Sequence, residues 1–148
     1  MSCKTFFDTC IQKTEVTLSN CKVAENKASF MISSTSQVQF EKIKFDECNC
    51  PISKPLEKRC DWIIHSISNN TLYFIELKGA DIVKALEQLE NSVKIVKPKK
   101  KFECHIVKSS GAGGIPSFST KFQVIKKKIV GMGGDIFKPH SSTHIIKI

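Results

Sequence analysis

Residues 60–96 of the chain read CDWIIHSISNNTLYFIELKGADIVKALEQLENSVKIV, and this stretch decides the fold. Two largely apolar runs, at 62–65 and 72–77, are separated by a polar segment that is typical of a turn. Both runs are apolar on both faces, which indicates strands in the middle of a covered sheet rather than at a wet surface. The stretch therefore predicts two neighbouring central strands.

Charged side chains stand at the ends of these strands: Asp61 precedes the first, and Glu76 and Lys78 close the second. An unpaired buried carboxylate is costly, and a divalent cation would explain these positions. With Asn69-Asn70 as a two-residue turn, paired residue numbers sum to 139, which places Asp61 opposite Lys78. Asp61 and Glu76 are then diagonal neighbours on one face, about 7–8 Å apart, and both reach one hard cation. A cross-strand salt-bridge cluster is the alternative explanation.

A helix is expected directly after the second strand. Gly79 ends that strand, Asp81 is a favourable N-cap, and Pro98 stops the helix. The apolar residues of 82–96 fall on one helical stripe, which consists of Ile82, Leu86, Leu89, Val93 and Val96. The stretch thus forms a strand–strand–helix unit with three charged groups at one strand end.

Asp61, the later Glu76-Leu77-Lys78 and the following helix resemble the PD-(D/E)XK nuclease superfamily, although Cys60 stands where the nominal Pro would be. The resemblance covers residues 38–96. It implies an α/β fold with a central mixed β-sheet flanked by helices, restriction-endonuclease-like, and a Mg²⁺- or Mn²⁺-dependent endonuclease. Carried across, Asp61, Glu76 and the Leu77 backbone carbonyl bind the metal, and Lys78 assists the attacking water. Many nucleases of this fold act as dimers, so a homodimer is the implied assembly.

Two accessory site residues are weaker expectations. Residues 2–14 carry apolar side chains at helical spacing, and some family members supply an acidic residue from their first helix. Asp8 and Glu15 are the two options here, and ordinary surface charge is the alternative. Gln88, on the helix after the core strands, is a further polar option, for which plain surface exposure is the alternative.

The positive charge is concentrated in the C-terminal part. The net charge is +9, yet residues 1–93 hold 11 basic and 12 acidic groups, while residues 94–148 hold 12 lysines and two acidic groups. This asymmetry favours an anionic partner, nucleic acid first and DNA ahead of RNA, and a solvated lysine face is the alternative. With Arg59 as the chain's one arginine, the lysines favour contact with the phosphate backbone over base readout. The expected contacts are Lys99, Lys100, Lys101, Lys126, Lys127 and Lys128.

Length and composition fit one domain at 1–148, with its core at 38–96 and its basic part at 94–148. No apolar run approaches a membrane span and no signal-peptide pattern begins the chain, so we expect an intracellular protein, cytoplasmic or associated with nucleoid or nucleus, without membrane contact. Seven irregularly spaced cysteines indicate reduced, buried thiols. Cys48 and Cys50 are poorly spaced for zinc.

Further elements are expected along the rest of the chain. A strand at 28–32, a turn at 33–36 and a strand at 37–45 with a bulge near Glu41-Lys42 precede the core. After it come strands at 102–107 and 143–148, a glycine-rich loop at 109–114 and a helix at 117–129. His140 and His144 are interpreted as structural residues.

Two other functions remain open at this stage. A nucleic-acid-binding protein or accessory subunit with a degenerate nuclease fold would bind without cutting. A protein-interaction domain would show no nucleic-acid affinity. The motif alone does not decide, because Glu25-Asn26-Lys27 also matches Glu-x-Lys.

Overall fold

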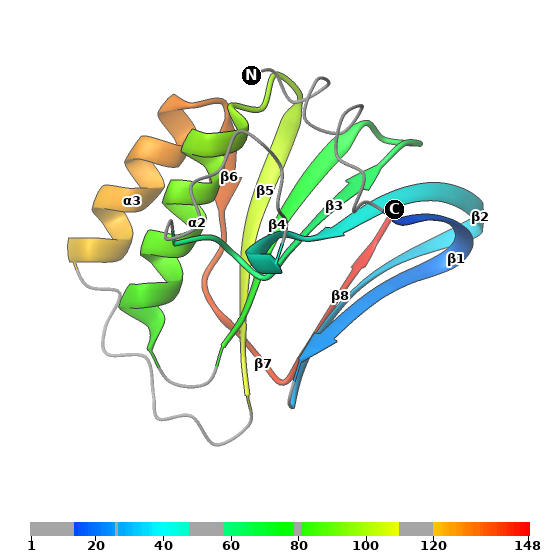
Figure 1. The fold of residues 1–148 in the computed structure, drawn as a ribbon, viewed down its shortest axis with the longest axis horizontal. Helices are drawn as coiled ribbons and strands as arrows, with labels where there is room; N and C mark the ends of the chain where they lie inside the picture. Colours follow the sequence, from blue (N-terminus) through cyan, green and yellow to red (C-terminus); the bar gives the residue numbers. More distant parts are fainter. Residues whose placement is uncertain (1–13, 26, 48–57, 79–80, 110–119) are drawn as a thin grey trace.

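The computed structural model describes residues 14–25, 27–47, 58–78, 81–109 and 120–148. These residues form one mixed, open sheet of eight strands and two α-helices, so the predicted α/β class with a mixed sheet is confirmed. Figure 1 shows the two described helices on one face of the sheet. Among the described residues, the opposite face is covered by strands that curl over it.

In chain order, the elements are β1 (Thr14–Glu25), β2 (Ala28–Lys44), the 3₁₀ helix η1 (Phe45–Glu47), β3 (Trp62–Ser66), β4 (Thr71–Lys78), α2 (Ile82–Val96), β5 (Lys101–Lys108), α3 (Thr120–Gly131), β6 (Gly134–Ile136), β7 (His140–Ser141) and β8 (Thr143–Lys147). The main strand order is β1-β2-β3-β4-β5-β6. Strands β1 to β4 are antiparallel, and β4, β5 and β6 are parallel. The short strands β7 and β8 add in parallel to β5 and β2.

The β3–β4 hairpin has a longer turn than predicted. Ser66 pairs with Thr71, so four residues form the turn and paired numbers sum to 137 rather than 139. Asn70 adopts the left-handed region at φ 49°, which asparagine tolerates well. A shift of two residues keeps every side chain on its predicted face but moves the partners. Continued by one residue, the register brings Asp61 opposite Glu76 instead of Lys78. The predicted pairing was therefore wrong, and the observed pairing brings the two carboxyl groups closer together.

Helix α2 forms where it was predicted. The Asp81 side chain caps it by accepting a hydrogen bond from the Lys84 amide at 2.9 Å, and the helix ends at a left-handed Lys97 immediately before Pro98. Most of the predicted stripe is buried: Leu86, Leu89, Val93 and Val96. This helix provides the crossover between the parallel strands β4 and β5.

The strand before the core differs from the expectation. Residues 28–44 form one continuous strand, and the predicted turn at 33–36 lies within it, where the β1–β2 register is irregular. The bulge expected near Glu41-Lys42 is wrong, since β2 pairs with β3 without interruption from Phe40 to Lys44. Phe40 and Ile43 point into different cores on opposite faces of the sheet, which explains the pattern that suggested a bulge.

Two apolar cores lie on the two faces of the sheet. The first lies between the sheet and the helices and includes Phe74, Leu89 and Ile125. The second consists of strand residues such as Phe30 and Tyr73 and lies inside the curve of the sheet. Apolar burial of this kind contributes about 25 cal/mol per Å² and stabilises the central strands from both sides. The predicted buried thiols are confirmed for Cys21, Cys60 and Cys104.

Several expectations can be compared directly with the remaining elements. The strands at 102–107 and 143–148 correspond to β5 and β8, and the helix at 117–129 corresponds to α3 from Thr120 onward. The expected helix at 2–14, Asp8, Cys48, Cys50 and almost all of the glycine-rich loop lie outside the described residues. No described helix has both the length and the apolar character needed to cross a membrane.

Candidate metal centre

Asp61 and Glu76 meet at the centre of the protein, as predicted. Asp61 lies in a bend just before β3, and Glu76 is a fully buried residue of β4. The backbone N–H of Asp61 donates to Glu76 Oε1 at 3.1 Å, and the N–H of Leu77 donates to Asp61 Oδ2 at 2.7 Å. These contacts fix both carboxyl groups against the two strand ends.

The two carboxyl groups raise each other's cost of ionisation. Burial, followed by the negative charge of Glu76, raises the pKa of Asp61 to about 8, against the opposing effect of the Leu77 N–H. A carboxyl group with so high a pKa lies in a site where a nearby positive charge would be strongly stabilising. The local electrostatics therefore favour a cation beside Asp61.

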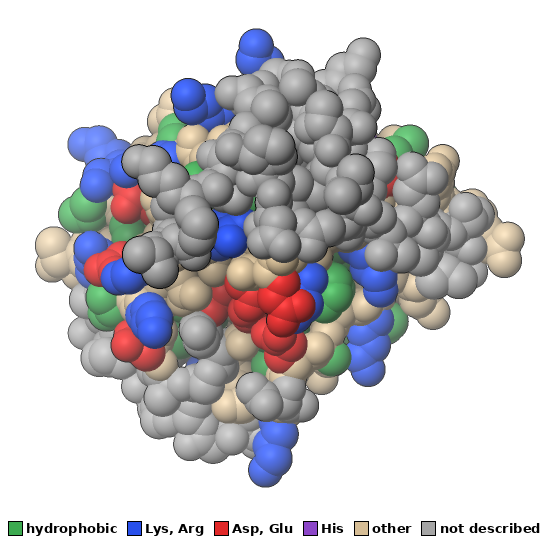
Figure 2. Space-filling view, viewed as in Figure 1, with side chains coloured by type: hydrophobic (Ala, Val, Ile, Leu, Met, Phe, Trp, Pro, Cys, Tyr) green, Lys and Arg blue, Asp and Glu red, His purple; other side chains and the backbone are tan. Residues whose placement is uncertain are grey.

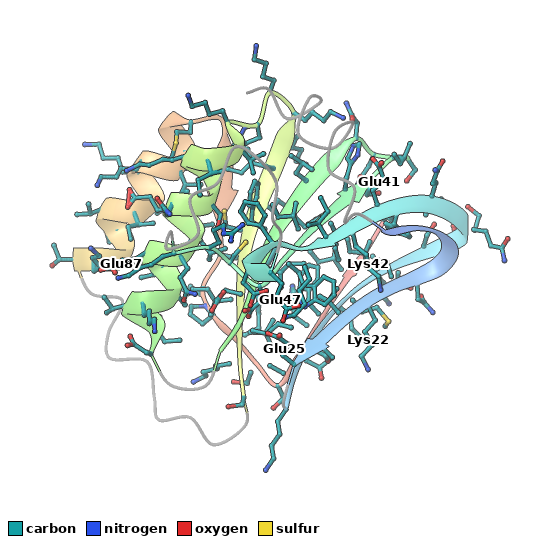
Figure 3. All side chains as sticks on the ribbon, viewed as in Figure 1. Lys22, Glu25, Glu41, Lys42, Glu47 and Glu87 are labelled. Carbon is teal, nitrogen blue, oxygen red and sulfur yellow. The ribbon has the colours of Figure 1, made fainter. Side chains whose placement is uncertain are left out.

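Two further acidic residues join Asp61, and the sequence analysis missed both. Glu25 is the last residue of β1 and Asp46 belongs to η1, and their carboxylate oxygens lie with those of Asp61 within 4.8 Å of one another. The N–H of Phe45 donates to the Asp61 carbonyl oxygen at 2.8 Å, which holds η1 against the bend. Figure 2 shows a patch of acidic side chains at the centre of this face, and Figure 3 shows Glu25 in this region. Glu25, Asp46, Asp61 and Glu76 are called the acidic cluster below.

Lys44 is the cation that the described structure places in the acidic cluster. Its ammonium group is ion-paired with Glu25 and lies 3.3 Å from Asp46 Oδ1. It also lies 5.3 Å from the centre of the Trp62 ring. Lys44 therefore neutralises the outer, more exposed part of the cluster, while Asp61 and Glu76 form its inner part.

The predicted roles of Lys78 and Leu77 are only partly visible. Lys78 is the last residue of β4, two residues beyond Glu76, and its backbone pairs with Lys108, but its side chain is outside the described part of the structure. The Leu77 N–H orients Asp61, and metal binding by the Leu77 carbonyl stays a prediction.

One of the two accessory residues, Glu15, lies in a position other than the one expected, whereas Gln88 lies on the predicted helix α2. Glu15 is on strand β1 rather than on a helix, and it pairs with Glu41, which in turn pairs with His65. Across the sheet, Glu15 is therefore aligned with His65, which is four residues after Asp61. Glu25, at the other end of β1, is the acidic residue that lies near Asp61.

Gln88 is buried, so the alternative of plain surface exposure was wrong. Its side chain is 8% exposed, and its Nε2 donates to the Arg59 carbonyl oxygen at 3.1 Å. Cys60, the residue between Arg59 and Asp61, is also tied to α2, because its N–H donates to Ser92 Oγ at 2.8 Å. Gln88 Nε2 therefore positions the chain that leads into Asp61, while Gln88 Oε1 is buried without a partner among the described residues.

The predicted lysine contacts lie at the opposite end of the sheet. Lys101 pairs with Thr71 at the start of β4, whereas Glu76 is near its end. Helix α3 ends beside β6, which also pairs with the start of β5. Lys126 and Lys128 are ion-paired, with Asp135 at 3.2 Å and Glu90 at 3.4 Å respectively. The runs 99–101 and 126–128 thus do not surround the acidic cluster.

The acidic cluster fits a hard divalent cation by the chemistry of its donors. All four side chains offer carboxylate oxygens, the ligands that Mg²⁺ and Mn²⁺ prefer. Asp46 is exposed and Glu25 is partly exposed, whereas Asp61 and Glu76 are buried. A cation here would have protein ligands on its inner side and access to water and an anionic group on its outer side.

Comparisons with known proteins leave the function to be inferred from this geometry. A scan against protein-family models finds no matching family, and searches of curated proteins and of solved structures find no match. The acidic cluster and the motif of strand β4 are therefore the observations from which function is inferred.

Proposed function

We propose that this protein is a metal-dependent nuclease of the PD-(D/E)XK type, with a restriction-endonuclease-like fold, that hydrolyses phosphodiester bonds in DNA rather than RNA. The observation that carries the proposal is the contact between Asp61 and Glu76 on neighbouring strands, within a larger cluster of carboxylates. The Glu-x-Lys motif ends one of these strands, and helix α2 follows it.

Each residue of the cluster has a distinct part in the proposal. Asp61 and Glu76 bind the divalent cation, Mg²⁺ or Mn²⁺, from the buried side, with Glu25 and Asp46 on the outer side. The Leu77 N–H holds Asp61 Oδ2, and the Asp61 carboxyl group would be one ligand of the cation. When bound, the cation supplies Lewis acidity toward the scissile phosphate and the attacking water. Lys78, two residues beyond Glu76 on β4, positions that water and stabilises the negative charge that develops on the phosphate.

The substrate backbone is held by lysines rather than by base-reading arginines. Those at the end of the sheet near the cluster include Lys44 and Lys108. The run at 99–101 leads into the start of β5, and the run at 126–128 lies on α3, so both lie away from the acidic cluster. In this proposal they contact the nucleic-acid backbone away from the cleaved bond. Affinity that depends mainly on such contacts falls steeply with salt concentration.

The test is cleavage of labelled duplex and single-stranded DNA and RNA with Mg²⁺, Mn²⁺ or EDTA. We expect metal-dependent cleavage by the wild type, its loss in Glu76→Ala, and nucleic-acid affinity in that variant within a few-fold of wild type. Glu87→Ala is the matched control, because Glu87 is an ion-paired glutamate on the surface of α2, outside the acidic cluster. A fully active Glu76→Ala variant would contradict the proposal.

A second candidate function is supported by the position of Lys44. Because its ammonium group already neutralises Glu25 and Asp46, the cluster also fits a nuclease fold that binds nucleic acid without cutting it. Salt-dependent binding with no cleavage under any metal would favour this second candidate.

A further inference from the structure

Three of the chain's four histidines gather at a second place in the sheet. His105 belongs to β5, His140 to β7 and His144 to β8, and their ring nitrogens lie within 4.8 Å of one another. From the sequence, His140 and His144 were interpreted as structural residues. These three residues are called the histidine cluster below.

Backbone pairing holds the histidine cluster in place. His140 pairs with Val107 of β5, and His144 pairs with Phe30 of β2. Between them, the Ser142 N–H donates to the Lys108 carbonyl oxygen at 2.8 Å, and the Ser142 carbonyl accepts from the Ser29 N–H at 2.8 Å. The β7–β8 segment therefore bridges β5 and β2 and fixes the backbone that carries two of the three rings.

Two nitrogens of the cluster have no hydrogen-bond partner in the described structure. His105 is 2% exposed, and its Nε2 lies 3.0 Å from Glu103 Oε1, whereas its Nδ1 is buried without a partner. His140 Nε2 is also buried without a partner. A buried polar atom without a partner costs about 1–3 kcal/mol. Stacking of rings does not explain why two such atoms should lie in one cluster, but a ligand would.

Burial lowers the pKa values of the two partly exposed rings, His140 and His144. Burial, followed by the neighbouring His144 and His105, lowers the pKa of His140 to about 4. Burial, then His105, also lowers the pKa of His144, against the opposing effect of Glu103.

We propose that His105, His140 and His144 form a binding site for a transition-metal ion, Zn²⁺ in the first place. His105 binds through Nδ1 and His140 through Nε2, the two nitrogens without partners. Three imidazoles with one position open to solvent are a donor set that suits zinc, and the carboxylate ligands of the acidic cluster suit a different class of metal. Glu103 accepts the Nε2–H of His105, as outer-shell carboxylates do for zinc-binding histidines.

Binding requires a small rearrangement of one ring. The rings of His140 and His144 are stacked at 3.4 Å with an interplanar angle of 6°, so they do not both point at one ion in this arrangement. Nitrogens in a tetrahedral zinc site lie about 3.3 Å apart, as follows from Zn–N distances of about 2.0–2.1 Å. His105 is held between Phe30 at 5.0 Å and Phe137 at 4.9 Å, whereas His144 is only partly buried, so we expect the His144 ring to be the one that turns.

The test is titration of the purified full chain with Zn²⁺, with affinity measured by competition against a coloured chelator. We expect one tightly bound Zn²⁺ per chain. We expect His140→Gln and His144→Gln each to lower the Zn²⁺ affinity by more than about 100-fold, which is more than the loss of an outer-shell partner typically causes. These partly exposed positions are chosen because His105 is buried and its replacement endangers folding. His65→Gln is the control, since His65 is the remaining histidine and lies outside the cluster, beside Glu41.

Cobalt substitution separates this site from the chain's cysteines. We expect Co²⁺ to give visible absorption typical of nitrogen ligands without thiolate charge-transfer bands, and we expect His144→Gln to abolish it while circular dichroism stays unchanged. Equal Zn²⁺ affinity in wild type, His140→Gln and His144→Gln would overturn the proposal. Thiolate bands, or no Zn²⁺ binding by the wild type, would overturn it as well.

Discussion

The acidic cluster and the histidine cluster lie on the same sheet but have opposite chemistry. The acidic cluster combines four carboxyl groups, two of them buried, and burial, followed by the charge of Glu76, raises the pKa of Asp61 to about 8. The histidine cluster combines three imidazole rings, and burial lowers the pKa values of His140 and His144. Hard divalent cations favour the first and zinc favours the second. One chain thus offers two sites that different metals should distinguish.

The largest expected effect is on cleavage, through the inner part of the acidic cluster. Asp61→Asn keeps the shape of the side chain but removes its charge, so the divalent cation loses a ligand that the proposal places at its centre. We expect the Mg²⁺-dependent cleavage rate to fall by about 1000-fold or more, which corresponds to about 4 kcal/mol of transition-state stabilisation. Single-turnover cleavage of a labelled duplex measures this effect.

The same variant tests whether the two clusters are independent. Zn²⁺ affinity should be unchanged in Asp61→Asn, and Mg²⁺-dependent cleavage should be unchanged in His144→Gln. If Asp61→Asn weakened Zn²⁺ binding as strongly as it reduced cleavage, the two clusters would not be separate sites.

A smaller effect is expected from the outer shell of the histidine cluster. Glu103→Gln removes the carboxylate charge beside His105 Nε2, which lies 3.0 Å from Glu103 Oε1. Outer-shell losses of this kind typically cost about 10–100-fold in metal affinity, and we expect a loss in that range for Zn²⁺. Chelator competition measures it, and Glu87→Gln, which is distant from the histidine cluster, is the matched control. Unchanged Zn²⁺ affinity would show that Glu103 is a neighbour of His105 without influence on the metal.

Stability gives a third way to compare the clusters. In EDTA, Glu76→Gln removes one of two buried, mutually repelling carboxyl groups, while Gln Oε1 can still accept the Asp61 N–H. We therefore expect the free energy of unfolding to rise by about 1 kcal/mol, although the variant no longer cleaves. Urea denaturation in EDTA measures the change. A clear loss of stability would show that Glu76 is held by favourable structural contacts rather than kept for a cation.

Local pattern predicted the part of the acidic site that lies on neighbouring elements. The stripe of α2, its Asp81 cap and the apolar strands are encoded within short windows, and all were found. The turn length was wrong by two residues because Asn69-Asn70 is compatible with more than one turn. A shift by two residues leaves each side chain on the same face of the sheet, so Asp61 and Glu76 still lie in contact.

Residues brought in by distant pairing escaped the sequence analysis. Glu25 was set aside as part of a chance Glu-x-Lys match, and its position follows from the long β1–β2 hairpin, which no local signal places beside Asp61. His140 and His144 reach His105 only through parallel pairing of β7 and β8 with strands far away in the sequence. Pairings of this kind depend on the whole fold, whereas patterns in a single sequence indicate mainly the local structure of residues that are close together in the chain.

The smallest effect, on Lys44, separates the two candidate functions of the acidic cluster. Burial opposes the charge of Lys44, but its hydrogen bond to Glu25 and the charge of Asp46 outweigh it and raise the pKa of Lys44. A divalent cation must therefore share these carboxylates with an ammonium group. Lys44→Gln should tighten Mg²⁺ binding several-fold, while removing a partly exposed ion pair costs about 0.5 kcal/mol of stability in EDTA.

Calorimetric titration with Mg²⁺ measures this change, and Lys42→Gln is the control, because Lys42 lies near the same Trp62 ring at 5.8 Å. If Lys44 only neutralises the cluster, cleavage in Lys44→Gln stays at or above the wild-type rate. If cleavage is lost while Mg²⁺ binds more tightly, Lys44 itself stabilises the reacting phosphate, and its ammonium group performs part of the role assigned to Lys78. If neither protein cleaves and Mg²⁺ binds only after Lys44 is replaced, the ammonium group takes the place of the metal. The fold would then be one that binds nucleic acid without cutting it, and the histidine cluster would be the chain's metal site.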